Sequence, residues 1–191
     1  MTSIVIDHLD TRFRTDKDIG IAYLYCNFRQ QHKRSDLFAS LLKQLSWRQP
    51  FIPKGLQRLY EHHRDRQTRP SFDEILRELQ SIVASYQRVF IIIDALDECQ
   101  ISDGGRTNFL TEILSFQDET GANLFVTSRV VQEIAKLFNQ SVSLEIQARN
   151  EDVQRYLDGH MSRLPLFVLS SPDLQFEIKT MISKAVNGMY V

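Results

Sequence analysis

The feature that most constrains the fold of this chain is an unbroken apolar run, Val89–Ile93, that ends in the carboxylate of Asp94. Such a run, rich in β-branched side chains, predicts a strand that is covered on both of its faces. Amphipathic stretches separate the apolar runs. This alternation predicts an open, largely parallel α/β sheet. The strands so predicted cover residues 21–28, 89–94, 123–127 and 142–146.

Apolar residues at helical spacing predict the helices between these strands. Leu37, Leu41 and Leu45 recur every four residues and would line one face of a helix. Ser71 and Glu74 have the spacing of a capping box, which marks the beginning of a helix. The predicted helices cover residues 3–9, 36–47, 55–64, 71–86, 106–116, 131–138, 150–161 and 172–186.

Composition narrows the class of protein further. The 191 residues are 42% hydrophobic and 25% charged, which suits one globular domain, and the net charge of −1 points to neither nucleic acid nor a membrane surface. No stretch approaches the ~20 apolar residues of a membrane span. The two cysteines form no CxxC motif, so we expect a reducing, cytoplasmic location. Basic residues outnumber acidic ones between Arg29 and Arg69, as in a solvated face or a docking surface for an acidic partner.

Three acidic residues follow the strongest strand, at Asp94, Asp97 and Glu98. Ligands of open parallel sheets bind at the carboxyl ends of the strands. An apolar strand that ends in Asp is what a P-loop NTPase uses to hold Mg²⁺, and a further acid can orient or deprotonate the attacking water. An ordinary acidic turn after a core strand fits the same residues, and the residues alone leave both interpretations open.

The segment RVFIIIDALDEC, Arg88–Cys99, closely resembles the extended Walker B motif of NACHT domains in the signal-transduction (STAND) P-loop NTPases. ANLFVTSR, Ala122–Arg129, resembles the sensor 1 strand of that family, and AYLYCNF, Ala22–Phe28, resembles the strand before its helical insertion. Among NACHT domains, the chain most resembles the nephrocystin-3-like N-terminal type. Those domains typically precede ankyrin or other repeats.

The resemblance implies a three-layer α/β/α fold of the P-loop NTPase type and a nucleotide site at the strand ends. Asp94 becomes the carboxylate associated with Mg²⁺, and Asp97 and Glu98 become the acidic pair near the hydrolytic water. The cofactor of the parent family would be ATP or GTP with Mg²⁺.

The resemblance also implies roles for the residues at the end of the sensor 1 strand. Arg129 becomes the arginine that supplies positive charge to the γ-phosphate in the transition state. Thr127 and Ser128 can donate hydrogen bonds at the same place. The alternative for Arg129 is a surface arginine that begins a helix and binds no ligand.

The family's layout also divides the chain into consecutive segments. These are a remnant of the first helix (1–20), a strand (21–28), a helical insertion (29–87), the Walker B and sensor core (88–147) and the beginning of a C-terminal helical region (148–191).

The phosphate-binding motif G-x-x-x-x-G-K-S/T is absent, since none of the seven glycines precedes a lysine. In the family that loop precedes a helix similar to Thr2–Leu9. We therefore expect a domain truncated after the loop, without the central first strand. The favoured function is that of a partial NACHT domain that neither hydrolyses nor binds nucleotide as this chain. The alternatives are a degenerate module that acts through self-association or through full-length NACHT relatives, and a working Mg²⁺-dependent NTPase.

Overall fold

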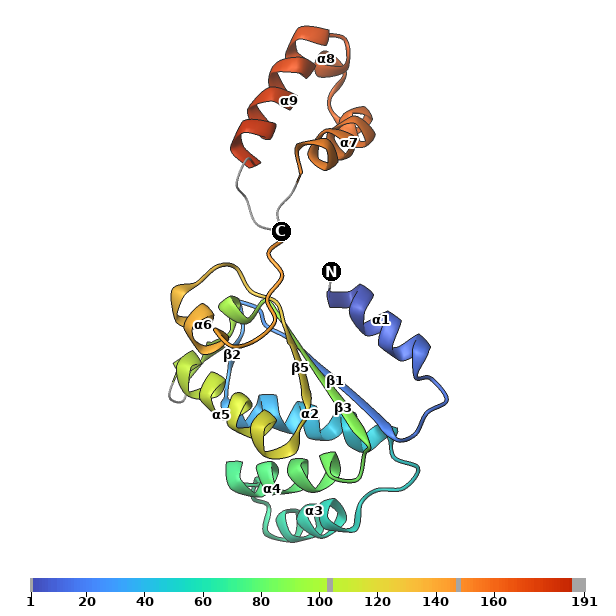
Figure 1. The fold of residues 1–191 in the computed structure, drawn as a ribbon, viewed down its shortest axis with the longest axis vertical. Helices are drawn as coiled ribbons and strands as arrows, with labels where there is room; N and C mark the ends of the chain where they lie inside the picture. Colours follow the sequence, from blue (N-terminus) through green and yellow to red (C-terminus); the bar gives the residue numbers. More distant parts are fainter. Residues whose placement is uncertain (1, 103–104, 147–148, 187–191) are drawn as a thin grey trace. The chain divides into compact units, whose positions relative to one another are not determined.

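The computed structural model describes residues 2–102, 105–146 and 149–186 (Figure 1). The chain folds as two compact units, residues 1–137 and residues 138–191. In the described ranges, no helix is both long and apolar enough to cross a membrane.

A parallel three-stranded sheet organises the first unit (Figure 1). Its strands are β1 (Ile19–Tyr25), β3 (Arg88–Asp94) and β5 (Asn123–Val126), with β3 in the middle. Because both pairings are parallel, each connection crosses over through helices, as the alternating sequence pattern predicts. The first three predicted strands are therefore confirmed, with ends shifted by a few residues.

Helices cover both faces of this sheet, which gives the predicted three-layer α/β/α arrangement. On one face, Ile6 of α1 (Thr2–Arg12) belongs to a buried cluster with Ile21 and Ile92. On the other face, Phe38 of α2 (Arg34–Arg48) packs edge-to-face against Phe109 of α5. The same layer contains α4 (Phe72–Val83) and α5 (Gly105–Thr120), and α3 (Lys54–Arg66) lies against α4.

The two helical layers explain why the sequence of β3 is a continuous apolar run. Successive side chains of a strand point to opposite faces, so a strand that is covered on one face alternates between apolar and polar residues. Here Ile91, Ile92 and Ile93 are all buried, although they point alternately to the two faces. Each fully buried side chain of this size contributes about 1.5–3 kcal/mol to folding.

The capping box at the beginning of α4 is confirmed. The Ser71 hydroxyl accepts a hydrogen bond from the Glu74 backbone N–H, and the Glu74 carboxylate accepts one from the Ser71 N–H at 2.8 Å. The Ser71 hydroxyl also donates to this carboxylate at 2.8 Å, and the two bonds donated by Ser71 stabilise its ionised form and lower the pKa of Glu74 to about 2.

A second, two-stranded parallel sheet forms outside the main sheet. The sequence pattern did not predict it. It joins β2 (Gln31–His32) to β4 (Gln100–Ile101). Two-residue strands have no periodicity that a sequence pattern can reveal. The chain segments that follow β1 and β3 therefore pair a second time, over two residues each.

The second unit is helical. It contains α7 (Asn150–His160), α8 (Leu166–Leu169) and α9 (Pro172–Val186). Gln154 and Ser183 are hydrogen-bonded, and Lys179 and Asp158 form an ion pair, so α7 and α9 lie side by side. The predicted helices 150–161 and 172–186 are confirmed, and α6 (Gln132–Leu137) in the first unit confirms the helix predicted at 131–138.

The prediction of a strand at 142–146 is wrong. These residues form no strand, and the side chains of Val142 and Leu144 are exposed. A strand needs a neighbour that supplies backbone hydrogen bonds, and a short apolar run does not specify one. Without such pairing, β propensity alone does not produce a strand.

Candidate functional site

The carboxyl ends of β3 and β5 bring Asp94 and Thr127 together. One carboxylate oxygen of Asp94, Oδ1, accepts a hydrogen bond from the Thr127 hydroxyl at 2.6 Å. The same oxygen accepts a bond from the hydroxyl of Thr2, which is buried at the beginning of α1. Among the described residues, nothing donates to the other oxygen, Oδ2. Asp94 is half-buried, so its carboxylate is oriented by two hydroxyl groups and still has an available oxygen.

Thr127 also holds the turn that follows Asp94. Its hydroxyl accepts a bond from the Ala95 N–H at 3.0 Å, and its carbonyl accepts one from the Leu96 N–H at 2.9 Å. Ala95 has a φ of 51°, in the left-handed region, which costs a residue with a side chain roughly 1–2 kcal/mol. The bonds to Thr127 and the complete burial of Leu96 offset that cost.

The short 3₁₀ turn Leu96–Glu98, labelled η1, places Asp97 against the segment that follows β5. Both carboxylate oxygens of Asp97 are bonded to Arg129, one to its backbone N–H at 3.1 Å and one to its side-chain Nε at 2.5 Å. Burial acts to raise the pKa of Asp97, but the hydrogen bonds and charge of Arg129 outweigh it and lower that pKa. Asp97 and Arg129 therefore form an ion pair whose acid is nearly buried and whose base is mostly exposed.

The remaining predicted site residues are arranged differently. The Ser128 hydroxyl donates to the carbonyl of Arg129, at 2.7 Å, and not to Asp94. The Glu98 side chain is half-buried, and in the described part of the chain its carboxylate accepts no hydrogen bond. The structure thus brings Asp94 and Thr127 together as one pair and Asp97 and Arg129 as another.

Two residues at the site were not predicted from the sequence. Thr2 contacts Asp94, and Arg106 at the beginning of α5 donates to the backbone carbonyl of Asp97 at 2.6 Å. Arg106 also lies 3.6 Å from the carboxylate of Glu133. The signal that could have identified Thr2 is its hydroxyl in the first turn of a predicted helix that precedes a strand. The contact of Arg106 depends on tertiary packing.

The charge of the site is predominantly negative. Asp94, Asp97 and Glu98 lie at one end of the sheet with Arg129 and Arg106. Within the described ranges, no three His, Cys, Asp or Glu side chains are grouped as a metal site. The groups that could bind a ligand are the oriented Asp94 carboxylate with its available oxygen, the hydroxyls of Thr2 and Thr127, and the carboxylate of Glu98, which accepts no hydrogen bond from a described residue.

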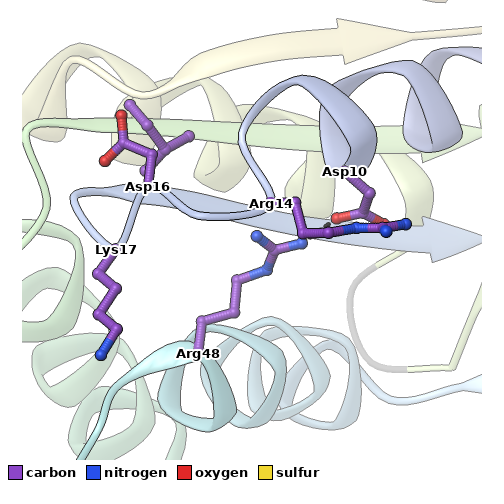
Figure 2. Close-up of a pocket in the computed structure, with 6 residues that line it drawn as sticks. Asp10, Arg14, Asp16, Lys17 and Arg48 are labelled. Atoms are coloured by element: carbon purple, nitrogen blue, oxygen red, sulfur yellow. Dashed lines mark hydrogen bonds and ion pairs between the residues drawn. The ribbon is translucent and has the colours of Figure 1, made fainter.

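A pocket of about 450 Å³ lies at the other end of the sheet (Figure 2). It is formed where the turn after α1 enters β1, and an ion pair between Arg48 and Asp10 lines it. Among the described residues that line it, only Ile19 belongs to a strand, at the amino end of β1, whereas Asp94 ends the parallel strand β3. The pocket is therefore separate from the site at the carboxyl ends of the strands.

Comparison with known proteins identifies one family. The model of the family described as "Nephrocystin 3, N-terminal" matches residues 1–129, a span that includes all three strands of the main sheet and ends at Arg129. A search of curated proteins gave no match.

The pairing of Asp97 with Arg129 predicts a pH-dependent loss of stability in Arg129→Ala. Ionised Asp97 stabilises the fold above its ordinary pKa of 3.8, and that contribution is lost as the pH falls through its lower folded-state pKa. Removing Arg129 leaves a nearly buried carboxylate without its partner, so chemical denaturation at pH 7 should show a lower free energy of unfolding.

The control is Arg69→Ala, which removes an exposed arginine that forms no ion pair with any described residue. We expect the difference between wild type and Arg129→Ala to shrink below pH 3.8. Equal losses in the two variants, or a difference that persists unchanged in acid, would contradict the role assigned to this ion pair.

Proposed function

Because the chain belongs to the nephrocystin 3, N-terminal family, we propose that the carboxyl ends of β3 and β5 form the metal-binding and sensor half of a NACHT-type nucleotide site. The observation that carries this proposal is the Asp94 carboxylate, which two hydroxyl groups orient while its second oxygen receives no bond among the described residues. A strand-end aspartate beside a hydroxyl is the pair of oxygen ligands with which P-loop NTPases hold Mg²⁺.

The donor set fits a magnesium ion that enters with a nucleotide. Mg²⁺ keeps several water ligands and is usually held by one or two carboxylates together with substrate phosphates, not by a complete protein cage. Asp94 and the hydroxyl of Thr2 would be its protein ligands. When bound, the ion neutralises charge on the phosphate oxygens.

The acidic residues after Asp94 have different proposed roles. Both oxygens of Asp97 are bonded to Arg129, so Asp97 positions the arginine and the turn. Glu98 accepts no hydrogen bond in the described part of the chain, which makes it the better candidate for the group that orients or deprotonates water. Because Arg129 bonds Asp97 through its backbone N–H and its Nε, the two Nη groups of its guanidinium would be the ones to contact a phosphate.

We further propose that this chain alone holds no nucleotide firmly and hydrolyses none. A triphosphate would meet Asp94, Asp97 and Glu98 with Arg129 already paired. Like charges repel unless a cation lies between them, and the lysine and glycine-rich loop that supply most of the attraction in P-loop NTPases do not occur in this sequence. In this account the chain contributes the acidic half of a site in a signalling domain.

Titration with Mn²⁺, a paramagnetic substitute for Mg²⁺, tests the metal-binding role of Asp94. In an amide NMR spectrum, we expect millimolar Mn²⁺ to broaden the signals of Asp94–Glu98 and Thr127 before the others. Asp94→Asn should remove this selectivity. The matched control is Asp118→Asn, which makes the same change at an exposed position of α5 and should behave as wild type.

A fluorescent ATP analogue added to the same samples with Mg²⁺ tests the second half of the proposal. We expect no saturable binding up to about 1 mM, a level that corresponds to a binding free energy near −4 kcal/mol. Saturable binding that Asp94→Asn removes and Asp118→Asn retains would contradict it. Mn²⁺ broadening that is equal in all three proteins would contradict the metal-binding role of Asp94.

A second function, self-association, is favoured by the free edge of β5. The strand pairs with β3 on one side, and no described residue pairs with its other side. Phe125 aligns with Ile92, which α1 covers, yet its own side chain is 36% exposed. An unpaired strand edge that carries an exposed aromatic side chain is a template for pairing with another chain. A second copy of this chain is the partner that we propose.

Sedimentation velocity over a range of concentrations tests this alternative. We expect a dimer that forms at micromolar to millimolar concentration and that Phe125→Lys weakens at least about tenfold, because the lysine charge opposes strand pairing. Phe51→Lys is the control, since Phe51 is 85% exposed in the segment between α2 and α3. A chain that stays monomeric throughout, or two variants with equal effects, would exclude pairing through β5.

A further inference from the structure

The pocket at the amino end of β1 is lined by more positive than negative side chains (Figure 2). Its volume is about 450 Å³, and its lining consists of Asp10, Arg14, Asp16, Lys17, Ile19 and Arg48. Three of these side chains are cations and two are carboxylates, so positive charge is in excess. Figure 2 shows the Arg48 side chain extending from α2 toward Asp10 of α1 and toward Arg14, which lies just beyond the end of that helix.

The two acids of the pocket are already bonded within the protein. Oδ1 of Asp10 is paired with the guanidinium of Arg48. Oδ1 of Asp16 accepts a hydrogen bond from the backbone N–H of Asp18 at 3.0 Å, which holds this carboxylate against its own turn. The second oxygen of each acid accepts no hydrogen bond from a described residue. These oxygens can therefore accept hydroxyl groups of a ligand, but the two acids do not neutralise all three cations.

Two of the three cations have no partner among the described residues. The side chains of Arg14 and Lys17 form neither a hydrogen bond nor an ion pair there. Arg48 bonds Asp10 through Nη2 and has further N–H groups that can donate. Like charges that share a pocket repel each other unless an anion lies between them. A ligand that enters this pocket thus meets several unused donors, all of them positively charged.

The turn between α1 and β1, which supplies most of the lining, is fixed in place by the sheet. At the beginning of the turn, the Phe13 ring stacks on Phe90 of β3, with ring centroids 5.8 Å apart. At its end, the carbonyl of Asp18 accepts the backbone N–H of Gln87 at 2.9 Å, and the Asp18 carboxylate accepts the Gln87 side-chain amide at 2.9 Å. Because the lining is held before a ligand arrives, binding costs little free energy for ordering it.

We propose that this pocket binds a small phosphate monoester of the sugar phosphate class. The phosphate would lie among Arg14, Lys17 and Arg48, because its oxygens accept charge-assisted hydrogen bonds from several cations at once. A volume of about 450 Å³ lies within the range of roughly 300–1,000 Å³ that is typical of small-molecule sites, and a phosphate group alone would leave most of it empty. The second oxygens of Asp10 and Asp16 favour a body that carries hydroxyl groups.

Titration of the full chain with ribose 5-phosphate, followed in an amide NMR spectrum, tests this proposal. We expect the signals of residues 14–19 and of Arg48 to shift together, with a dissociation constant of about 1–10 mM, as suits a few charge-assisted bonds in an open pocket. Ribose, which has no phosphate, should cause no such shift at the same concentrations. Inorganic phosphate should shift the same signals with an affinity about threefold weaker, because it makes no hydrogen bonds through hydroxyls of a sugar.

The double variant Arg14→Gln/Lys17→Gln removes both unpaired cations and keeps the ion pair of Arg48 with Asp10. It should bind ribose 5-phosphate at least about tenfold more weakly than wild type. The matched control is Arg69→Gln, which changes an exposed arginine outside the pocket and should bind as wild type does. Before ligand is added, the signals of residues outside the substituted turn should coincide with those of wild type.

The pocket and the proposed site at Asp94 lie at opposite ends of the sheet, so each proposal can fail without the other. Equal shifts with ribose and ribose 5-phosphate would overturn the phosphate site, and this comparison needs no variant. Undiminished affinity in the double variant, or shifts confined to Asp94–Glu98, would overturn it as well. Inorganic phosphate that binds as tightly as ribose 5-phosphate would overturn the assignment to sugar phosphates.

Discussion

The hydrogen bond between Asp94 and Thr127 is the interaction on which the rest of the site depends. It joins the carboxyl end of the central strand to that of β5 and leaves the hydroxyl of Thr127 free to accept the N–H of Ala95. The chain then turns through the left-handed conformation of Ala95. From that turn, the Asp97 carboxylate reaches Arg129.

Much of the first unit could be predicted because its signals are local. The run Val89–Ile93 has no polar member, so only a strand that is covered on both faces can bury it, and helices cover β3 on both sides. The capping box of Ser71 and Glu74 is formed between residues three apart. Where the structure depends on a distant partner, local signals fail. The run at 142–146 has the composition of a strand but pairs with no strand among the described residues. The pairing of β2 with β4 depends on segments far apart in sequence.

The candidate site also contains some features that the sequence predicts and others that depend on tertiary structure. The sequence predicts that Asp94 and Thr127 each lie at the end of a strand. It does not predict that these strands are neighbours, because the direct pairing of β3 with β5 depends on strand order. The pairing of Asp97 with Arg129 does not follow, because it depends on the direction that the turn takes after Ala95. Thr2 and Arg106 belong to helices whose positions against the sheet are determined by tertiary packing, which a local sequence pattern does not predict. The roles assigned to these residues in binding a metal or a nucleotide stay proposals.

A double-mutant cycle between Asp94 and Thr127 tests the central claim most directly. Free energies of unfolding would be measured by chemical denaturation for wild type, Asp94→Ala, Thr127→Val and the double variant, with Thr127→Ser as a variant that keeps the hydroxyl. A hydrogen bond to a charged acceptor contributes about 1.5–3 kcal/mol, so the account predicts a coupling energy of at least about 1 kcal/mol and a small effect of Thr127→Ser. Strictly additive effects of the two substitutions would show that this bond does not hold the strand ends together.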